Sequence, residues 1–318
     1  MANFSAAAAM NTTTQDTFIP ELWSNEVVAA YKSNLVLANL VTTMNHNGKK
    51  GDTIHIPTPT RGSASSKTTR QQVTLIAATD SEISITISNH YEYSRLIEDL
   101  LDKQALTSMR QFYTDDAGYA LATQVDGDLW LQSYTLQGGT ANAISSGTTI
   151  DFGTAGTVIG SDGSTAFNAG TDNAVAIADA GLRKAIQTLD DQDVPMSDRF
   201  LVIPPVEKKN LTGIARFTEQ AFTGEIGGGN TIRNGLVGDL YGIPVYVSTN
   251  SPTDTEGSVD ARLCLLMHKS ALAMVEQMGV RTQTQYKQEF LGDLFTADTI
   301  YGTGELRNDA GIKIAVPA

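Results

Sequence analysis

Apolar and polar residues alternate in two separate stretches in the first third of the chain. In "GDTIHIP" and "SEISITIS" isoleucines occupy alternate positions, which is typical of strands with one buried face. The stretch between them, "TRGSASSKTTRQQ", is too polar to pack on itself. Residues 48–92 are therefore expected to form a long two-stranded loop that projects from the body of the protein and lies on another surface.

A helical period replaces this alternation further along the chain. Apolar residues recur at steps of three and four without an intervening proline, at Leu96, Leu100, Leu101, Met109, Phe112, Tyr113, Ala117, Ala120, Leu121, Val125 and Leu129. Residues 93–136 are thus predicted to form one amphipathic helix. At about 1.5 Å per residue such a helix would be roughly 60 Å long, which suits a strut better than the interior of a compact domain.

The second half of the chain mixes strands with short helices. Residues 137–171 are rich in Gly, Ser and Thr and are expected to form an exposed flap with short strands, or else a linker. Asp172 is a candidate N-cap of a second helix, which is followed by the apolar strand "RFLVIPP" and a helical turn at "VEKKNL". More strands follow, and "TADTIYGTGELRNDAGIKIAVPA" is expected to be a closing hairpin. The predicted fold class is α+β.

The glycines of "GLVGDLYGIPVYVS" raise the question of a phosphate-binding loop. Gly235, Gly238 and Gly242 have the spacing GxxGxxxG, no lysine follows, and a strand comes next where a phosphate loop needs a helix N-terminus. We interpret Gly242 and Pro244 as a tight entry into a strand.

Composition and charge narrow the function classes. The 318 residues suit one large domain or two to three lobes, and their net charge of −13 argues against non-specific binding of nucleic acid, which depends on Lys and Arg. No apolar stretch approaches the ~20 residues that span a bilayer, so no membrane partner is expected. The single cysteine, Cys264, is expected to pack in the core, as in a protein of a reducing cytoplasm.

The sequence motifs of the common enzyme and metal sites are missing. GxxxxGK[ST], HExxH, CxxC and GxSxG do not occur, and the four histidines lack the spacing of paired metal ligands. The acidic cluster of Asp190, Asp191 and Asp193 lacks the glycine and the glutamate of a calcium loop. We therefore expect no enzyme activity, no cofactor and no metal.

The order of these segments resembles the major capsid proteins of tailed bacteriophages, with the Hong Kong phage type fold. The resemblance rests on "TFIPELWSNEVVAAYKSNLVLANLV" before "GDTIHIP", on "RFLVIPP", and on "GLVGDLYGIPVYVSTNSP" before "LCLLMHKSALAMV". It covers nearly the whole chain. It implies an N-terminal arm and first helix (1–47), an extended β-hairpin loop (48–92), the spine helix of a peripheral domain (93–136), a flap (137–171), an α/β axial domain (about 172–290), and C-terminal strands that return to the peripheral domain (291–318).

The resemblance also implies a function and a set of partners. Copies of such a chain assemble as pentamers and hexamers into the icosahedral head of the virion, which encloses double-stranded DNA without binding it strongly, after synthesis in the host bacterial cytoplasm. Pro20 follows the N-terminus closely, so a separate scaffolding protein is implied, together with a portal protein and, in some members, a decoration or cement protein. Some relatives crosslink a loop lysine to an asparagine, for which Lys67 and Asn308 are candidates here. No catalytic glutamate can be assigned, and non-covalent contacts are expected.

Charge is unevenly distributed between two of these segments. The loop carries Arg61, Lys67 and Arg70, whereas the expected start of the spine helix carries Glu98, Asp99 and Asp102. Since the resemblance lays the loop of one copy across the peripheral domain of the next, these six residues are predicted to meet between subunits. The acidic residues also complement the dipole of their own helix, which is the alternative role.

Three other functions remain open at the level of sequence. An encapsulin-like compartment shell shares the same fold. A tail-tube or adhesin subunit would be mostly β structure without the long helix. An α/β hydrolase or transferase would need polar residues that converge on one pocket, and the sequence shows no such set.

Overall fold

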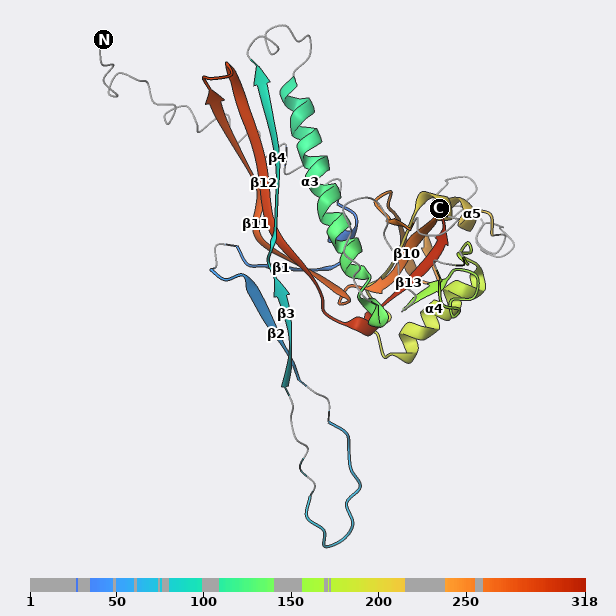
Figure 1. Cartoon of the computed structure of the whole chain (residues 1–318). Coiled ribbons are helices and arrows are strands. Elements are labelled where there is room, and N and C mark those ends of the chain that lie inside the picture. The colour runs from blue at the N-terminus through green and yellow to red at the C-terminus, as the bar shows by residue number, and fades with distance from the viewer. Residues whose placement is uncertain are drawn as a thin grey trace, which may run out of the picture.

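The computed structural model describes residues 27, 35–47, 50–59, 62–73, 75, 80–98, 109–139, 156–168, 171, 173–214, 238–254 and 260–318. Within these ranges the chain has an elongated lobe, where one helix lies along three long strands, and a more compact lobe beside it (Figure 1). A two-stranded hairpin projects from the elongated lobe (Figure 1). The mixture of helices and strands confirms the predicted α+β class.

The elongated lobe is built on a four-stranded sheet. Its order is β1 (Thr42–Asn45), β11 (Leu272–Lys287), β12 (Gly292–Glu305) and β4 (Asn89–Glu98). β1 runs parallel to β11, and the other neighbours are antiparallel. Helix α3 (Met109–Ser133) packs on one face of the sheet through a buried apolar cluster that includes Ala117, Leu121, Phe295 and Ala297.

The projecting hairpin consists of β2 (Thr53–Pro59) and β3 (Asp80–Thr86). The two strands pair antiparallel, with Ile54 opposite Ile85 and Ile56 opposite Ile83. The alternating isoleucines therefore lie on the same face of the hairpin, as the sequence pattern predicts.

The predicted start of the long helix is wrong. Residues 89–98, which were expected to complete the loop and begin a helix at 93, form strand β4 on the edge of the four-stranded sheet. Tyr91 and Tyr93 pack toward α3, whereas the side chain of Leu96 is 40% exposed on the other face. Leu96 therefore belongs to a two-residue period rather than to the helical one. The described helix begins at Met109, and Leu100 and Leu101 lie outside the described residues.

The compact lobe contains a seven-stranded sheet. Its order is β5 (Thr157–Ile159), β13 (Gly311–Pro317), β10 (Ala261–His268), β6 (Arg199–Ile203), β8 (Ile243–Val247) and β7 (Asp239–Leu240), with β9 (Thr253–Asp254) paired to β10. Two helices belong to this lobe, α4 (Asp179–Asp191) and α5 (Pro205–Thr212). The strand in "RFLVIPP" and the helical turn in "VEKKNL" are confirmed as β6 and α5.

Two expectations for residues 137–191 need correction. Helix α4 begins at Asp179. The residues before it pass close to Gly160, and the extended Ala178 donates its backbone N–H to the Gly160 oxygen. The candidate cap Asp172 lies outside the described residues. The part of the expected flap that is described, residues 156–168, is not wholly exposed: β5 joins the sheet edge, and Phe167 is 1% exposed.

The expected C-terminal hairpin does not form. β12 pairs with β11 and β4 in the four-stranded sheet, whereas β13 lies between β5 and β10 in the seven-stranded sheet. The chain therefore crosses from one lobe to the other between Glu305 and Gly311, through the 3₁₀ turn η5 (Asn308–Ala310). The chain also crosses between β10 and β11, which lie in different sheets. The expected domain boundary at 290/291 falls between β11 and β12, which are neighbours in the same sheet.

The glycine-rich stretch around Gly242 is a hairpin turn. Tyr241 and Gly242 both have positive φ angles, 53° and 78°, between β7 and β8. Positive φ at both central residues is the signature of the type I′ turn, which favours glycine at the second position. The interpretation of Gly242 as a tight entry into a strand is confirmed.

Candidate assembly surfaces

The root of the projecting hairpin is fixed by a close backbone crossing. A Cβ atom added at Gly302 of β12 would lie 2.6 Å from the carbonyl oxygen of Thr86, so only glycine lets β12 approach the end of β3 this closely. Beside it, Ile85 and Ile87 are buried against Ala273 and Val275 of β11. The hairpin is thus anchored at one end by backbone contact and apolar packing.

The far end of the hairpin is open and exposed. Residues 62–68 and 71–73 have no strand partner among the described residues, and the side chains of Lys67 and Arg70 are exposed. Arg70 has a φ angle of 69°, in a turn where Gln71 donates its backbone N–H to the Thr68 oxygen. Val73 and Leu75 are 61% and 89% exposed. This end therefore presents basic and apolar side chains together.

Of the predicted acidic partners, only Glu98 is described, and Arg61, Asp99 and Asp102 lie outside the described residues. Glu98 is exposed at the end of β4, opposite Gly292. It does not lie in the first turn of a helix, so for Glu98 the alternative of a dipole role is wrong. The end of β4 and the hairpin tip lie at opposite ends of the molecule (Figure 1). Within one copy, Lys67 and Arg70 therefore do not contact Glu98.

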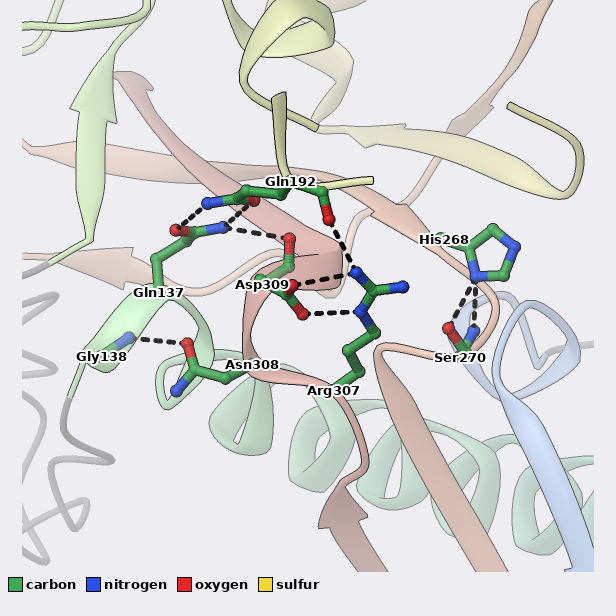
Figure 2. Close-up of polar contacts among 8 residues, drawn as sticks. All are labelled: Gln137, Gly138, Gln192, His268, Ser270, Arg307, Asn308 and Asp309. Atoms are coloured by element: carbon green, nitrogen blue, oxygen red, sulfur yellow. Dashed lines mark hydrogen bonds and ion pairs between the residues drawn. The ribbon is translucent and has the colours of Figure 1, made fainter. Parts of the chain in front are cut away.

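A polar cluster joins the two lobes where α3 ends (Figure 2). The 3₁₀ turn η3 (Leu136–Gly138) follows α3, and the side-chain amides of Gln137 and Gln192 exchange hydrogen bonds of 3.0 and 3.1 Å. Gln192 caps the end of α4. Gly138 donates its N–H to the Asn308 side-chain oxygen at 2.9 Å. The end of one helix in each lobe is thus tied to the crossing between β12 and β13.

Arg307 completes this cluster at the crossing. Its guanidinium donates two hydrogen bonds to the carboxylate of Asp309 and one to the backbone oxygen of Gln192. The pKa of Arg307 is raised, chiefly by the hydrogen bond to Asp309, so the group is cationic at every physiological pH. At the other crossing, between β10 and β11, Ser270 donates its backbone N–H to Nδ1 of His268 (Figure 2). Each described crossing is therefore held by its own polar contacts.

Asp126 attaches residues 36–38 to α3. Its carboxylate is fully buried and accepts hydrogen bonds from the backbone N–H groups of Val36 and Ala38 at 3.0 and 3.3 Å. Burial raises the pKa of this carboxyl, and the backbone donors oppose the shift. The 3₁₀ turn η2 (Leu37–Asn39) begins at these donors, so the carboxylate satisfies groups that the turn leaves unpaired.

Replacing Asp126 with alanine is expected to lower the free energy of unfolding by about 2 kcal/mol, because two backbone donors lose a buried, charged acceptor. Asp126→Asn keeps one acceptor oxygen and should cost less. Urea unfolding of the unassembled subunit measures both values. The matched control is Asp115→Ala on the exposed face of the same helix, which should change the stability by less than about 0.5 kcal/mol. If Asp115→Ala and Asp126→Ala lower the free energy of unfolding equally, Asp126 does not hold residues 36–38 on α3.

The described residues include neither a reactive cysteine nor a cluster of metal ligands. Cys264 is fully buried, and burial raises the pKa of its thiol well above the usual range, which removes the thiolate needed for nucleophilic attack. Across the described ranges no group of three His, Cys, Asp or Glu residues is placed to hold a metal ion. In the same ranges, no helix combines the length and apolarity needed to cross a membrane. Asp190 pairs with the buried Arg199 at 2.7 Å, which is a structural contact.

Several solved structures share the fold of this chain over most of its length. A structure from Mycobacterium phage Che8 matches with a TM-score of 0.67 at 21% identity, over 88% of this chain and 90% of that one. The capsid of cyanophage P-SCSP1u matches with a TM-score of 0.65 at 19% identity, over 89% and 88% of the two chains. A virus-like particle from Pyrococcus furiosus gives 0.54 at 10% identity, over 94% and 100%. These likenesses show that the chain shares one fold with these three structures.

The family follows from the sequence itself. A family model described as phage capsid protein matches residues 15–314. The chain belongs to this family, and it is a structural, non-enzymatic component of a capsid. No curated protein matches it in sequence.

The sequence does not reveal the residues of the polar cluster between the lobes, nor the partners of Asp126. Gln137, Gln192 and Arg307 come from distant segments and follow no motif. Asp126 lies one helical turn from the apolar residues Ala122 and Trp130, a spacing that indicates burial, but the sequence does not show which groups it contacts. Their roles depend on which segments the fold brings together. For Gln137, the sequence signal is the glycine that follows it directly after the predicted helix, which is typical of a helix end.

Proposed function

We propose that this chain is the major capsid protein of a tailed bacteriophage, and that its copies assemble through pentamers and hexamers into an icosahedral head around double-stranded DNA. The observation that carries the proposal is the family match over residues 15–314, together with capsid structures that share the fold over about nine tenths of their length. The net charge of −13 suits the wall of such a head, because mild repulsion between the protein and DNA leaves the packaged DNA mobile.

The proposal includes the partners that the resemblance implies. Copies of the chain itself form the shell, a separate scaffolding protein guides assembly in the host bacterial cytoplasm, and a portal protein occupies one vertex. A decoration or cement protein is a further partner in some members. The chain would enclose DNA without binding it strongly, and the net charge of −13 supports this.

Negative-stain microscopy of the purified protein, produced with and without its candidate scaffolding protein, tests this function directly. Closed shells of uniform size support the proposal. Tubes or monomers under both conditions contradict it and favour a tail-tube subunit or an unrelated role. The 25-residue helix α3 already weighs against the tail-tube and adhesin alternative, which requires a mostly β structure.

An encapsulin-like compartment is the second candidate, and the similarity to the Pyrococcus furiosus virus-like particle is the observation that favours it. Both functions give closed shells, so the contents decide between them. Nuclease-protected DNA in shells isolated from infected cells supports the phage head, whereas a protein cargo without DNA supports the compartment.

The basic hairpin tip is proposed to contact the acidic end of β4 on a neighbouring copy. The two sites lie at opposite ends of one molecule (Figure 1), so a contact between them requires two copies. Arg61, Lys67 and Arg70 would face Glu98, Asp99 and Asp102. Each exposed pair contributes only about 0.2–1 kcal/mol, but the contact repeats at every interface of the shell.

Reversing the basic charges with Lys67→Glu and Arg70→Glu is expected to reduce shell yield severalfold at low salt, with a smaller defect as salt screens the repulsion. Adding Glu98→Lys and Asp102→Lys should restore assembly. Sedimentation across a salt series measures the yield. Normal assembly of the first variant at low salt, or failure of the second pair to rescue it, would assign the basic tip to another role.

A further inference from the structure

The turn between β11 and β12 presents two large apolar side chains to solvent. It comprises residues 288–291, and Lys287 pairs with Gly292 across its base. The side chains of Phe290 and Leu291, the last two residues of the turn, are 61% and 65% exposed. The folded subunit therefore leaves most of both side chains in water.

Leu291 also has a backbone conformation that leucine rarely adopts. Its φ angle is 47°, in the left-handed region that favours glycine and asparagine. The residue after it, Gly292, lies so close to β4 that an added Cβ would be 2.5 Å from the Ile97 oxygen. A leucine in this conformation costs backbone strain and buries little of its side chain within the subunit. Such a combination indicates a contact with another molecule.

Acidic side chains surround these two apolar residues. Glu289 precedes them in the turn, Asp293 follows them in β12, and Glu98 ends the neighbouring strand β4 opposite Gly292. All three acidic residues are exposed, and Lys287 is the only cationic residue between 287 and 293. The turn is thus an apolar surface with a negatively charged border.

The tip of the projecting hairpin has matching properties with the opposite charge. Val73 and Leu75 are 61% and 89% exposed, and the only charged residues between 62 and 73 are Lys67 and Arg70. The hairpin tip and the end of the elongated lobe that carries the turn lie at opposite ends of the molecule (Figure 1). The two surfaces can therefore meet only between two copies.

We propose that the hairpin tip of a neighbouring copy docks on this turn, with Val73 and Leu75 packed against Phe290 and Leu291. The inference rests on the proposed shell function and names the surface that receives the tip. Charge complementarity selects this occupant, because a second copy of the turn would bring acidic groups together, whereas the tip brings basic ones. Burial of the four apolar side chains then holds the contact.

Disulfide formation between two single-cysteine variants tests the contact directly. Leu75→Cys and Leu291→Cys chains are mixed in equal amounts, assembled under reducing conditions, and then treated with oxidised glutathione, which is reduced as two thiols form one disulfide. The native Cys264 is fully buried and does not interfere. A covalent dimer should form in the mixture and in neither variant alone. The matched control is Met196→Cys, at an exposed position of the compact lobe, which should form no dimer with Leu75→Cys.

A second test separates the contact from a role of the turn in folding. Leu291→Gly relieves the backbone strain, so the melting temperature of the subunit should stay the same or rise while shell yield falls severalfold. The double variant Val73→Ser, Leu75→Ser should show a similar loss of yield that does not diminish at high salt, because salt screens charges and not apolar contacts. Normal assembly of Leu291→Gly, or a fall in both its yield and its melting temperature, would contradict the docking role.

Three outcomes of the disulfide test decide between this inference and its alternatives. Dimers of Leu291→Cys alone would show that the turn contacts another copy of itself, and would overturn the proposed occupant. Closed shells without a dimer in the mixture would overturn the inference and leave the proposed function intact. A wild-type protein that forms no shells under any condition would remove the proposed function, and this inference with it.

Discussion

Replacing Gly181 with alanine is expected to destabilise the protein by about 3 kcal/mol, although alanine is the better helix former. Gly181 lies inside α4, where the helix crosses residues 160–163 in direct backbone contact. An added Cβ would overlap the carbonyl oxygen of Gly160, and the carbonyl of Gly181 itself lies against Gly163. Neither neighbour is a flexible side chain that can move aside, so the backbones must separate.

The control is the same replacement in the other long helix. Gly127 lies in α3 with no atom within 4 Å of an added Cβ, so Gly127→Ala should stabilise the protein by about 0.5–1 kcal/mol. Chemical denaturation of both variants measures the two changes. Opposite signs support the backbone crossing. A stabilising effect at both positions would show that α4 does not contact residues 160–163 this closely in solution.

The stability of the protein is expected to rise with pH between about 8 and 10.5 because of one buried lysine. Lys313 of β13 is fully buried, and its Nζ donates a hydrogen bond to the backbone oxygen of Tyr134 at 2.6 Å. Burial lowers the pKa of Lys313 from 10.5 to about 8, with Glu305 opposing the shift. Between these two pH values the unfolded chain binds a proton that the folded chain does not, so the folded state gains stability as pH rises.

Comparison with Lys313→Met isolates this effect from other groups that titrate in the same range. The stability of the wild type relative to the variant should be constant below pH 8 and should rise by about 3 kcal/mol up to pH 10.5. Thermal or urea unfolding at several pH values gives the difference. Lys209→Met, at an exposed position of α5, should show no such slope. If the difference in stability between the wild type and Lys313→Met does not change with pH, the amine of Lys313 reaches water in the folded protein.

The sequence predicted elements whose pattern depends only on neighbours along the chain. The alternating isoleucines gave β2 and β3, the apolar run gave β6, and the glycine and proline before "VYV" gave the turn into β8. It misplaced the start of α3, because Leu96 fits both a helical and a two-residue spacing, and only the neighbouring strand β12 decides between them.

Pairings between distant segments escaped prediction for a different reason. The strands β12 and β13 are separated by only a short turn and look like a hairpin in sequence, yet each finds its partners in a different sheet. Long-range pairing depends on which edges are already occupied, and no local pattern encodes that. The same holds for the sites. The exposed basic tip could be predicted from its composition, whereas the polar cluster of Gln137, Gln192 and Arg307 could not.

The position of β13 has a consequence for the order of events during synthesis. β13 lies inside the seven-stranded sheet, between β5 and β10, and it comes after every other strand of that sheet in the chain. Until residues 311–317 have left the ribosome, a nascent copy lacks an inner strand and keeps the inner edge of β5 unpaired. Copies on neighbouring ribosomes therefore cannot present a finished compact lobe to one another. The compact lobe can therefore be completed only after residues 311–317 have been synthesised, and a subunit that lacks them cannot offer its finished surface to a neighbour.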